Sequence, residues 1–248
     1  MIYLKNLDEL NALEKLNKMG AEVLSLCYNH LKPGVITLEL EEIALRYCLA
    51  NKVLPSFKNY RGFPHNICVS INDEVVHGFP SPRKILEGDI VKVDFGLKKD
   101  GLFSDSAFTK MIGKVPKRIK NLVETTKGCL DEAMAKACKG NRLYDISGSI
   151  ERLASANFFG VVRNFVGHGV GFALHESPKV PNYVTNGTNW KLTPGMVLAL
   201  EPILVEGSYD LVLQVNNWTV KTKDGGFSAH FEHSVAITEE GPRILSKL

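Results

Sequence analysis

The chain has few cysteines, and none of them form the closely spaced pairs of a zinc-binding motif. A disulfide framework needs paired cysteines, and a zinc ribbon needs them at short spacing. The 248 residues contain five, an odd number without a CxxC or CxxH pair: Cys27, Cys48, Cys68, Cys129 and Cys138. The sequence therefore argues against both classes and predicts reduced thiols in a cytoplasmic protein.

The sequence also lacks a long apolar segment and a strong net charge. No apolar run approaches the ~20 residues that cross a membrane, and the first residues turn polar too early for a signal peptide. Lysine and arginine total 30 against 27 aspartates and glutamates, and no basic stretch is interleaved with aromatics. We therefore expect neither membrane association nor specific binding of nucleic acid.

Hydrophobic periodicity predicts helices and strands in a repeated order. Leucines at every third position indicate an amphipathic helix over about 7–31, and Thr37 is a suitable cap for a second helix. Two more helices are expected from near 116 to 139 and from about 145 to 157. Strands are expected at 67–71, 74–77, 89–97, 102–112, 161–165, 196–204, 217–222 and 228–237. Helices followed by strands, twice over, predict an α+β fold.

The two halves share a short sequence match. GDIVKVD, ending at Asp94, corresponds to GMVLALE, ending at Glu201: each is a glycine, an apolar strand and then an acid. So short a match can arise by chance. If it reflects a duplication, Asp94 and Glu201 lie at related points about a pseudo-twofold axis. Without a long linker, we expect one domain, 1–248, with halves of about 1–112 and 113–248.

A hairpin in the first half brings two carboxylates together. If its turn is centred between Lys99 and Asp100, Asp94 and Asp105 lie directly opposite each other. A two-residue turn at Asp100 and Gly101 instead puts Asp105 diagonal to Asp94 on the same face. In both registers the like charges repel, and a divalent cation would remove that repulsion. The alternative is an exposed hairpin with both acids in water.

Three further residues suit a metal site. His168 lies in the glycine-rich segment FVGHGVGFALHESP, which could also be a mobile loop with solvated histidines. Glu201 ends an apolar strand, where a charge needs a metal or a salt bridge to Lys or Arg. Glu232 is similar, and His230 shares its face while His233 points away. Four carboxylates and one imidazole suit two ions such as Mn, Fe or Co, which activate water for hydrolysis.

The ordered set Asp94, Asp105, His168, Glu201 and Glu232 resembles the dinuclear site of the pita-bread metallopeptidases of family M24, subfamily A. Over essentially its whole length the chain resembles type 1 methionine aminopeptidases. The segments that carry this resemblance are INDEVVHGFP, GDIVKVDFGLKKDG, GHGVGFALHESP, LTPGMVLALEP, WTVKTKDG and SAHFEHSVAIT. The resemblance implies a pita-bread fold in which helix pairs and antiparallel strands repeat around a central metal site. It also implies removal of the initiator methionine before a small second residue.

The resemblance further implies a role for each site residue. Asp94 would chelate one metal and His168 the other, while Asp105 and Glu232 would bridge both. Glu201 would bind the His168 metal and transfer protons. His77 and His175 would contact the substrate without binding metal. The methionine side chain would lie in a pocket formed by Phe57, Tyr60, Phe63, Cys68 and Trp218.

The chain departs from the family pattern at three places near the site. Leu174 replaces a residue that is usually aromatic, Gly96 stands where many relatives have threonine, and Ser104 and Ser106 flank Asp105 in place of Gly and Thr. These changes affect the pocket wall and the hydrogen bonds around the ligands. They leave all five expected ligands intact.

Two other functions fit parts of the pattern. Peptidases of this fold that cut before proline usually carry a sizeable extra N-terminal domain, and only about 66 residues precede the first expected strand. Binding proteins of this fold without catalysis typically lose metal ligands, which are all present here. Type 2 enzymes carry a helical insertion that is absent between His175 and Glu232. We therefore expect a monomeric cytoplasmic enzyme that acts on nascent polypeptides, with transient contact to the ribosome.

Overall fold

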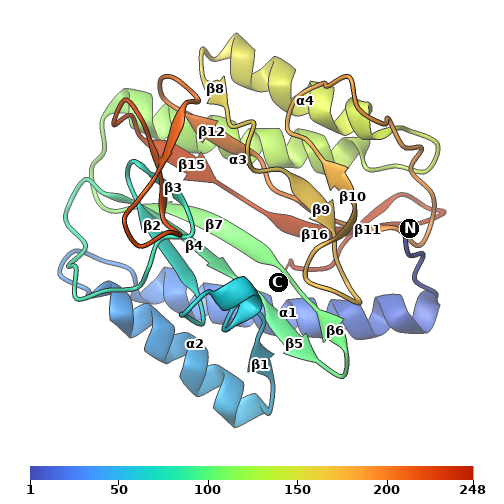
Figure 1. The fold of residues 1–248 in the computed structure, drawn as a ribbon, viewed down its shortest axis with the longest axis horizontal. Coiled ribbons are helices and arrows are strands. Elements are labelled where there is room, and N and C mark those ends of the chain that lie inside the picture. The colour runs from blue at the N-terminus through green and yellow to red at the C-terminus, as the bar shows by residue number, and fades with distance from the viewer. Residues whose placement is uncertain (248) are drawn as a thin grey trace.

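The strands lie between two pairs of helices in the computed structural model, which describes residues 1–247 (Figure 1). Helices α1 (Leu7–His30) and α2 (Thr37–Asn51) form one pair. Helices α3 (Lys117–Lys136) and α4 (Leu143–Ala156) form the other. None of the described helices has the length and apolar character needed to cross a membrane. The order of elements agrees with the predicted α+β fold.

A local sequence signal explains where α1 begins, whereas the signal expected for α2 does not. Asn6 caps α1: its side chain accepts a hydrogen bond from the Glu9 amide at 3.0 Å, and the Glu9 carboxylate accepts one from the Asn6 amide at 2.7 Å. The prediction that Thr37 caps α2 is wrong, because the cap residue is Ile36. The Thr37 hydroxyl instead donates to the Ser81 carbonyl at 2.8 Å and ties α2 to a distant loop.

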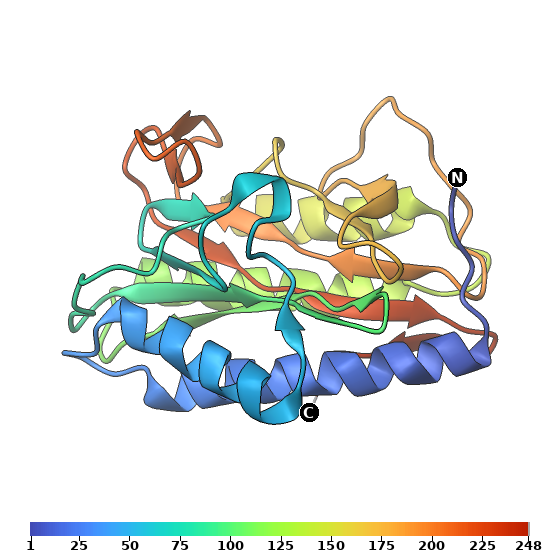
Figure 2. The same ribbon diagram turned by 60° about the horizontal axis from the view of Figure 1, so that its bottom comes forward.

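The first half contributes seven strands. The central sheet of this half has the antiparallel order β2-β4-β7, and its buried face packs on α1 and α2. Figure 2 shows these two helices on one face of the strands and the short helix η1 (Tyr60–Gly62) on the other. The strands are β1 (Leu54–Pro55), β2 (Cys68–Ile71), β3 (Glu74–Val76), β4 (Ile90–Phe95), β5 (Leu97–Lys99), β6 (Leu102–Phe103) and β7 (Ser106–Met111).

The second half has an analogous sheet, extended at both edges, in the order β10-β9-β11-β16-β17. Its core lies against α3 and α4. The strands are β8 (Gly160–Val161), β9 (Gly167–Gly169), β10 (Glu176–Val180), β11 (Val197–Leu200), β12 (Ile203–Val205), β13 (Leu211–Leu213), β14 (Val220–Thr222), β15 (Ser228–His230), β16 (His233–Ile237) and β17 (Pro242–Ile244).

Several expected strands are shorter or interrupted. The expected strand 196–204 divides into β11 and β12 at Glu201 and Pro202, as proline without an N–H predicts. The expected strand 228–237 divides into β15 and β16 at Phe231 and Glu232. The strand expected at 161–165 reaches only Val161, and the one expected at 217–222 begins at Val220.

A backbone contact between the halves lies at the pseudo-twofold axis. Asp94 pairs with Ala107 across β4 and β7, and the register of β11 with β16 continues to place Glu201 opposite Glu232. Ala107 and Glu232 then pair with each other, through amide-to-carbonyl hydrogen bonds of 3.3 and 3.0 Å. Equivalent positions of the two halves therefore meet, which agrees with the expected repeat.

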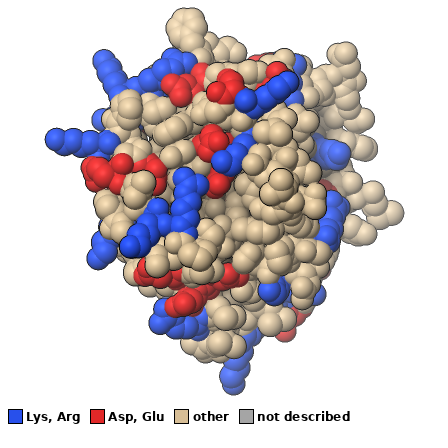
Figure 3. Space-filling view, turned by 60° about the vertical axis from the view of Figure 1, so that its left-hand side comes forward, with Lys and Arg blue, Asp and Glu red and all other residues tan. Residues whose placement is uncertain are grey.

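On the face seen in Figure 3, Lys and Arg side chains are interspersed with Asp and Glu. The near balance of 30 basic and 27 acidic residues underlies this pattern.

Candidate metal centre and substrate pocket

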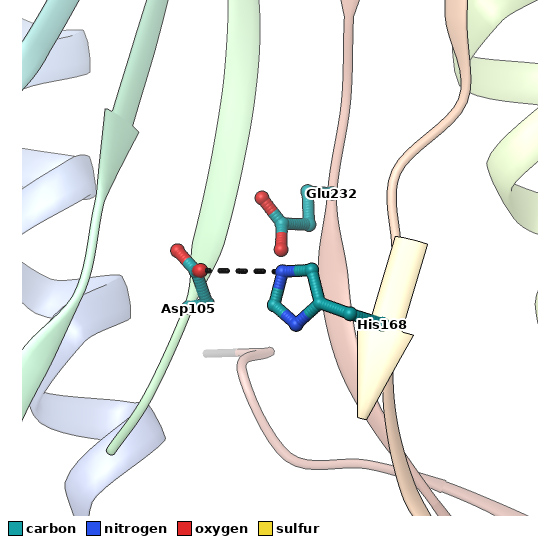
Figure 4. Close-up of side chains that lie close together, drawn as sticks. All are labelled: Asp105, His168 and Glu232. Carbon is teal, nitrogen blue, oxygen red and sulfur yellow. Dashed lines mark ion pairs between the residues drawn. The ribbon is translucent and has the colours of Figure 1, made fainter. Parts of the chain in front are cut away.

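Three side chains from distant parts of the chain converge on one point (Figure 4). Asp105, His168 and Glu232 each offer one ligand atom, and these atoms all lie within 4.8 Å of one another. His168 Nε2 is 3.8 Å from Asp105 Oδ2 and 3.6 Å from Glu201 Oε1. Asp105 directly precedes β7, His168 lies on β9 and Glu232 lies between β15 and β16, so both halves contribute.

The hairpin adopts the second of the two predicted registers. Its turn is Asp100 and Gly101, both with positive φ (50° and 78°), and Lys99 pairs with Leu102. Phe95 pairs with Ser106, which places Asp105 opposite Gly96 and diagonal to Asp94. The directly opposed register is therefore wrong. The two carboxylates nevertheless share one face of the hairpin, and the charge of Asp94 helps to raise the pKa of Asp105.

Gly96 owes its identity to crowding beside this hairpin. A Cβ there would lie 2.3 Å from Ser56 Oγ and 2.4 Å from the Ser104 carbonyl oxygen. The next nearest atom belongs to the ring of Phe57, at 3.2 Å. Glycine therefore lets the pocket wall approach the metal-site strands closely.

The four carboxyl groups gather without a Lys or Arg partner among residues 1–247: Asp105 and Glu232 are buried, and Asp94 and Glu201 are half-buried. Burial raises the pKa of Asp94 to about 7 and raises the pKa of Asp105, Glu201 and Glu232 well above their usual values, with mutual repulsion adding to the effect. Within residues 1–247, their ion-pair partners are His168 and His230 rather than Lys or Arg. The alternative of a salt bridge from Glu201 to Lys or Arg is thus not found.

Several buried ligand atoms lack hydrogen-bond partners. Asp94 Oδ1, Asp105 Oδ1 and Glu232 Oε1 are inaccessible to solvent and make no hydrogen bond. A buried, unpaired carboxylate oxygen is costly unless a cation compensates it. The donor set of carboxylate oxygens with one imidazole suits divalent metal ions. The residues present therefore fit a metal centre.

His168 is oriented as a ligand by its backbone contact. Its Nδ1 donates to the Gly169 carbonyl at 2.9 Å, which leaves the Nε2 lone pair facing the carboxylates. Burial lowers the pKa of His168 and keeps its ring neutral. Because His168 is buried on β9, the alternative of a solvated loop histidine is wrong for this residue. The flanking glycines have a packing role: a Cβ on Gly167 would lie 2.4 Å from the Ala199 carbonyl oxygen.

One pocket, of about 570 Å³, opens onto this cluster. Phe63 packs edge-to-face against Trp218, with ring centroids 5.1 Å apart, and forms the apolar wall with Phe57 and Cys68. Cys68 pairs with Asp94 across β2 and β4, so the apolar wall begins directly beside the carboxylates. All the site residues proposed from the sequence line this pocket: Phe57, Tyr60, Phe63, Cys68, His77, Asp94, Asp105, His168, His175, Glu201, Trp218 and Glu232.

Two histidines stand in the pocket outside the carboxylate cluster. His77 has a positive φ of 58°, uncommon for a non-glycine residue and often found at functional sites. Its carbonyl accepts a hydrogen bond of 3.2 Å from the Thr219 hydroxyl, beside Trp218. Burial lowers the pKa of His77 to about 4.

His175 is exposed at the rim of the pocket, 4.2 Å from the His168 ring between centroids. Its Nδ1 lies 2.9 Å from the Tyr60 hydroxyl, and the two rings stack. Partial desolvation, with His168, Arg61 and His77 nearby, lowers the pKa of His175 to about 3. Solvent on the exposed side moderates this shift, and the ring is neutral at physiological pH.

Four more residues line the pocket. Leu174, noted in the sequence as a departure, is 2% exposed and belongs to the apolar wall. His230 Nε2 lies 3.9 Å from Glu232 Oε2 and 4.0 Å from Glu201 Oε2. The two-residue period of a strand predicted that His230 shares the face of Glu232, but no function was assigned to it. Val76 and Phe165 were missed, and their only sequence signal is proximity to His77 and His168. His233 points away, as expected, and contacts Ser246 Oγ at 2.8 Å.

Comparisons with known proteins agree with this geometry. The model of the family described as Metallopeptidase family M24 matches residues 11–239. A methionine aminopeptidase from Clostridium acetobutylicum is 44% identical over 247 residues, covering 99% of both chains. The crystal structure of a methionine aminopeptidase from Thermotoga maritima superposes with a TM-score of 0.97 at 41% identity, covering 100% of both chains.

A prolidase from Pyrococcus furiosus shares the fold more distantly. It has a TM-score of 0.80 at 20% identity, and the match covers 99% of this chain but 65% of the prolidase. At that identity the likeness concerns the fold alone. The full-length relatives at over 40% identity and the family match decide the assignment: the chain belongs to metallopeptidase family M24 and groups there with the methionine aminopeptidases.

Proposed function

We propose that this protein is a methionyl aminopeptidase that removes the initiator methionine from proteins and peptides with a small second residue. The observation that carries the proposal is the meeting of two surfaces in one pocket. A buried carboxylate and imidazole cluster forms one side, and the apolar wall around Phe63 and Trp218 forms the other. An unbranched thioether suits an aromatic and sulfur-containing wall, and the cluster suits hydrolysis at the adjoining peptide bond.

The cluster would hold two divalent ions, with Mn, Fe and Co as the candidates. Asp94 would hold one ion and His168 the other, and Asp105 and Glu232 would contact both. Divalent ions there would supply a water of lowered pKa and polarise the scissile carbonyl. Glu201 would bind beside His168, accept the proton of the attacking water and return it to the leaving amine. Its half-buried position in the pocket and its raised pKa support this proton-transfer role.

His77 and His175 would bind the substrate around the scissile bond. Both rings are neutral because their pKa values are lowered, so each carries one N–H that can donate to a substrate oxygen. The methionine side chain would fill the pocket formed by Phe57, Tyr60, Phe63, Cys68 and Trp218. The preference for a small second residue follows from the family and is part of the proposal.

We also propose that residues 1–248 act as one catalytic domain with halves of about 1–112 and 113–248. The site draws on both halves, because Asp94 and Asp105 come from the first and His168, Glu201 and Glu232 from the second. The protein would act as a cytoplasmic monomer on nascent chains, in transient contact with the ribosome.

Peptide cleavage tests the function directly. Metal-free protein should be inactive, and Mn, Fe or Co should restore cleavage of Met-Ala-Ser while Met-Lys-Ser remains intact. Full activity after exhaustive chelation would refute the metal-dependent mechanism. Faster cleavage of Xaa-Pro peptides than of Met-Ala-Ser would instead favour the proline-directed peptidase.

A further inference from the structure

The first residues of the chain contact the segment that carries His175. We call residues 2–5 the N-terminal strap and residues 170–177 the His175 loop. Ile2 forms a parallel bridge with Ser177, and Tyr3 packs edge-to-face on Phe172 with ring centroids 5.9 Å apart. The Lys5 amide donates to the Gly195 carbonyl at 2.8 Å. The strap therefore lies fixed against the loop, although the two segments are far apart in sequence.

A buried ion pair joins the strap to the loop. Lys5 Nζ lies 2.5 Å from Glu176 Oε2, and the two side chains are 1% and 2% exposed. The other carboxylate oxygen of Glu176 accepts hydrogen bonds from the Phe172 and Ala173 amides at 2.5 and 3.0 Å. A charge pair so fully desolvated holds its geometry closely, and removal of one partner leaves the other as an uncompensated buried charge.

The loop is shaped around the lysine. Gly171 has a φ of 144°, and a Cβ there would lie 2.6 Å from Lys5 Cε. The Phe172 ring covers the ammonium, with its centroid 5.1 Å from Nζ. The Gly171 carbonyl meanwhile accepts a 2.7 Å hydrogen bond from the Phe103 amide, which anchors the loop to the first half. Gly171, Phe172 and Glu176 together form a binding site that fits the Lys5 side chain.

Glu176 directly follows His175, and Leu174 lies in the pocket wall. We propose that Lys5 is a positioning residue: through Glu176 it fixes the His175 loop so that the His175 ring meets the scissile carbonyl. The inference rests on the proposed aminopeptidase function. Lys5 itself touches neither the pocket nor the carboxylate cluster, so its effect on catalysis passes through the loop.

The test compares Lys5→Met and Glu176→Gln with the wild type. Methionine keeps the length of the stem, and glutamine keeps an oxygen that can accept the two loop amides. Displacement of a catalytic group by about 1 Å costs up to about 100-fold, so kcat for Met-Ala-Ser should fall by about 10- to 100-fold, with a smaller change in KM and unchanged metal content. Amide hydrogen exchange should accelerate at Phe172 and Ala173 and stay unchanged in β4 and β7.

Arg243→Met is the matched control. Arg243 pairs with Glu14 of α1 and so also joins the N-terminal region to the second half, but it does not contact the His175 loop. Its loss should leave kcat and the exchange of the loop amides unchanged. A fall in kcat equal to that of Lys5→Met would mean that loosening the N-terminal region at any point has the same effect, and it would overturn the specific role of Lys5.

Combination with His175→Ala separates positioning from general destabilisation. If Lys5 acts through His175, Lys5→Met should lower kcat by less than about threefold in the His175→Ala background. The proposal would be overturned if the two substitutions lowered kcat by the product of their separate effects, or if Lys5→Met had wild-type kcat and loop exchange.

If Lys5→Met does not fold, Glu176→Gln answers the same question. A wild-type protein that fails to cleave Met-Ala-Ser with any of the metals would remove the proposed function and this inference together, whereas an active wild type with unaffected variants would remove the inference alone.

Discussion

Replacement of His175 by alanine tests the proposed division between metal ligands and substrate contacts. His175 follows His168 by seven positions, and their rings are 4.2 Å apart. Proximity alone would permit either role. The Tyr60 hydroxyl, 2.9 Å from His175 Nδ1, can donate to that nitrogen, which leaves the single proton of the neutral ring on Nε2. An Nε2–H is a donor for the carbonyl oxygen and cannot bind a metal.

The expected loss follows from that donor. Hydrolysis builds negative charge on the carbonyl oxygen, and removal of one positioned donor typically costs about 10²- to 10³-fold in kcat, or ~2.7–4 kcal/mol. Tyr60→Phe would keep the ring but lose the bond that sets its proton. A neutral hydrogen bond contributes ~0.5–1.5 kcal/mol, so this variant should lose only about 2- to 13-fold.

The assay measures metal stoichiometry and steady-state kinetics on Met-Ala-Ser for both variants. His175→Ala should retain wild-type metal content and show the loss mainly in kcat, with a smaller change in KM. His30→Ala, which removes a histidine paired with Glu39 on the helical surface, is the control and should match the wild type. A metal-depleted His175→Ala would identify His175 as a ligand. A metal-replete and fully active one would show it to be a bystander.

Three further predictions concern the metal site, the pocket and the thiols. Asp105→Asn should lose most bound metal and nearly all activity, because Asp105 would contact both ions. A variant that retains its metal content and its activity, by metal analysis and turnover, would contradict this. Trp218→Ala removes an aromatic contact worth ~1–3 kcal/mol, so kcat/KM should fall about 5- to 150-fold for substrates that begin with Met. The fall should be clearly smaller for shorter first residues. An unchanged ratio of kcat/KM between Met and shorter first residues would contradict the proposed pocket. Native protein at pH 8 should react quickly with a thiol reagent at Cys138 alone, because the other four cysteines are buried. Burial also raises the pKa of Cys27 and Cys129 to about 12. Fast labelling of a second cysteine, located by mass spectrometry, would contradict this prediction.

Local sequence signals were sufficient for the elements whose form depends on nearby residues. The leucine period predicted α1, and the Asp-Gly turn predicted a hairpin with Asp94 and Asp105 on one face. Contacts between distant segments left no such signal. Lys92 reads as the exposed position of a strand, yet it is fully buried and donates to the Asn72 and Ser228 carbonyls at 2.6 and 2.8 Å. Its ammonium thus links the two halves, which only the assembled fold reveals.

Three of the five proposed metal ligands lie where an expected strand is interrupted, and this has a physical reason. Asp105 lies between β6 and β7, Glu201 between β11 and β12, and Glu232 between β15 and β16. An apolar run predicts a strand from end to end, because every residue in it favours the same pleated surface. In a regular ladder, however, neighbouring side chains point to opposite faces and stay in fixed rows. Interruption of pairing at these acids frees their carboxylates to turn towards one point, so the local rule fails where the site requires convergence.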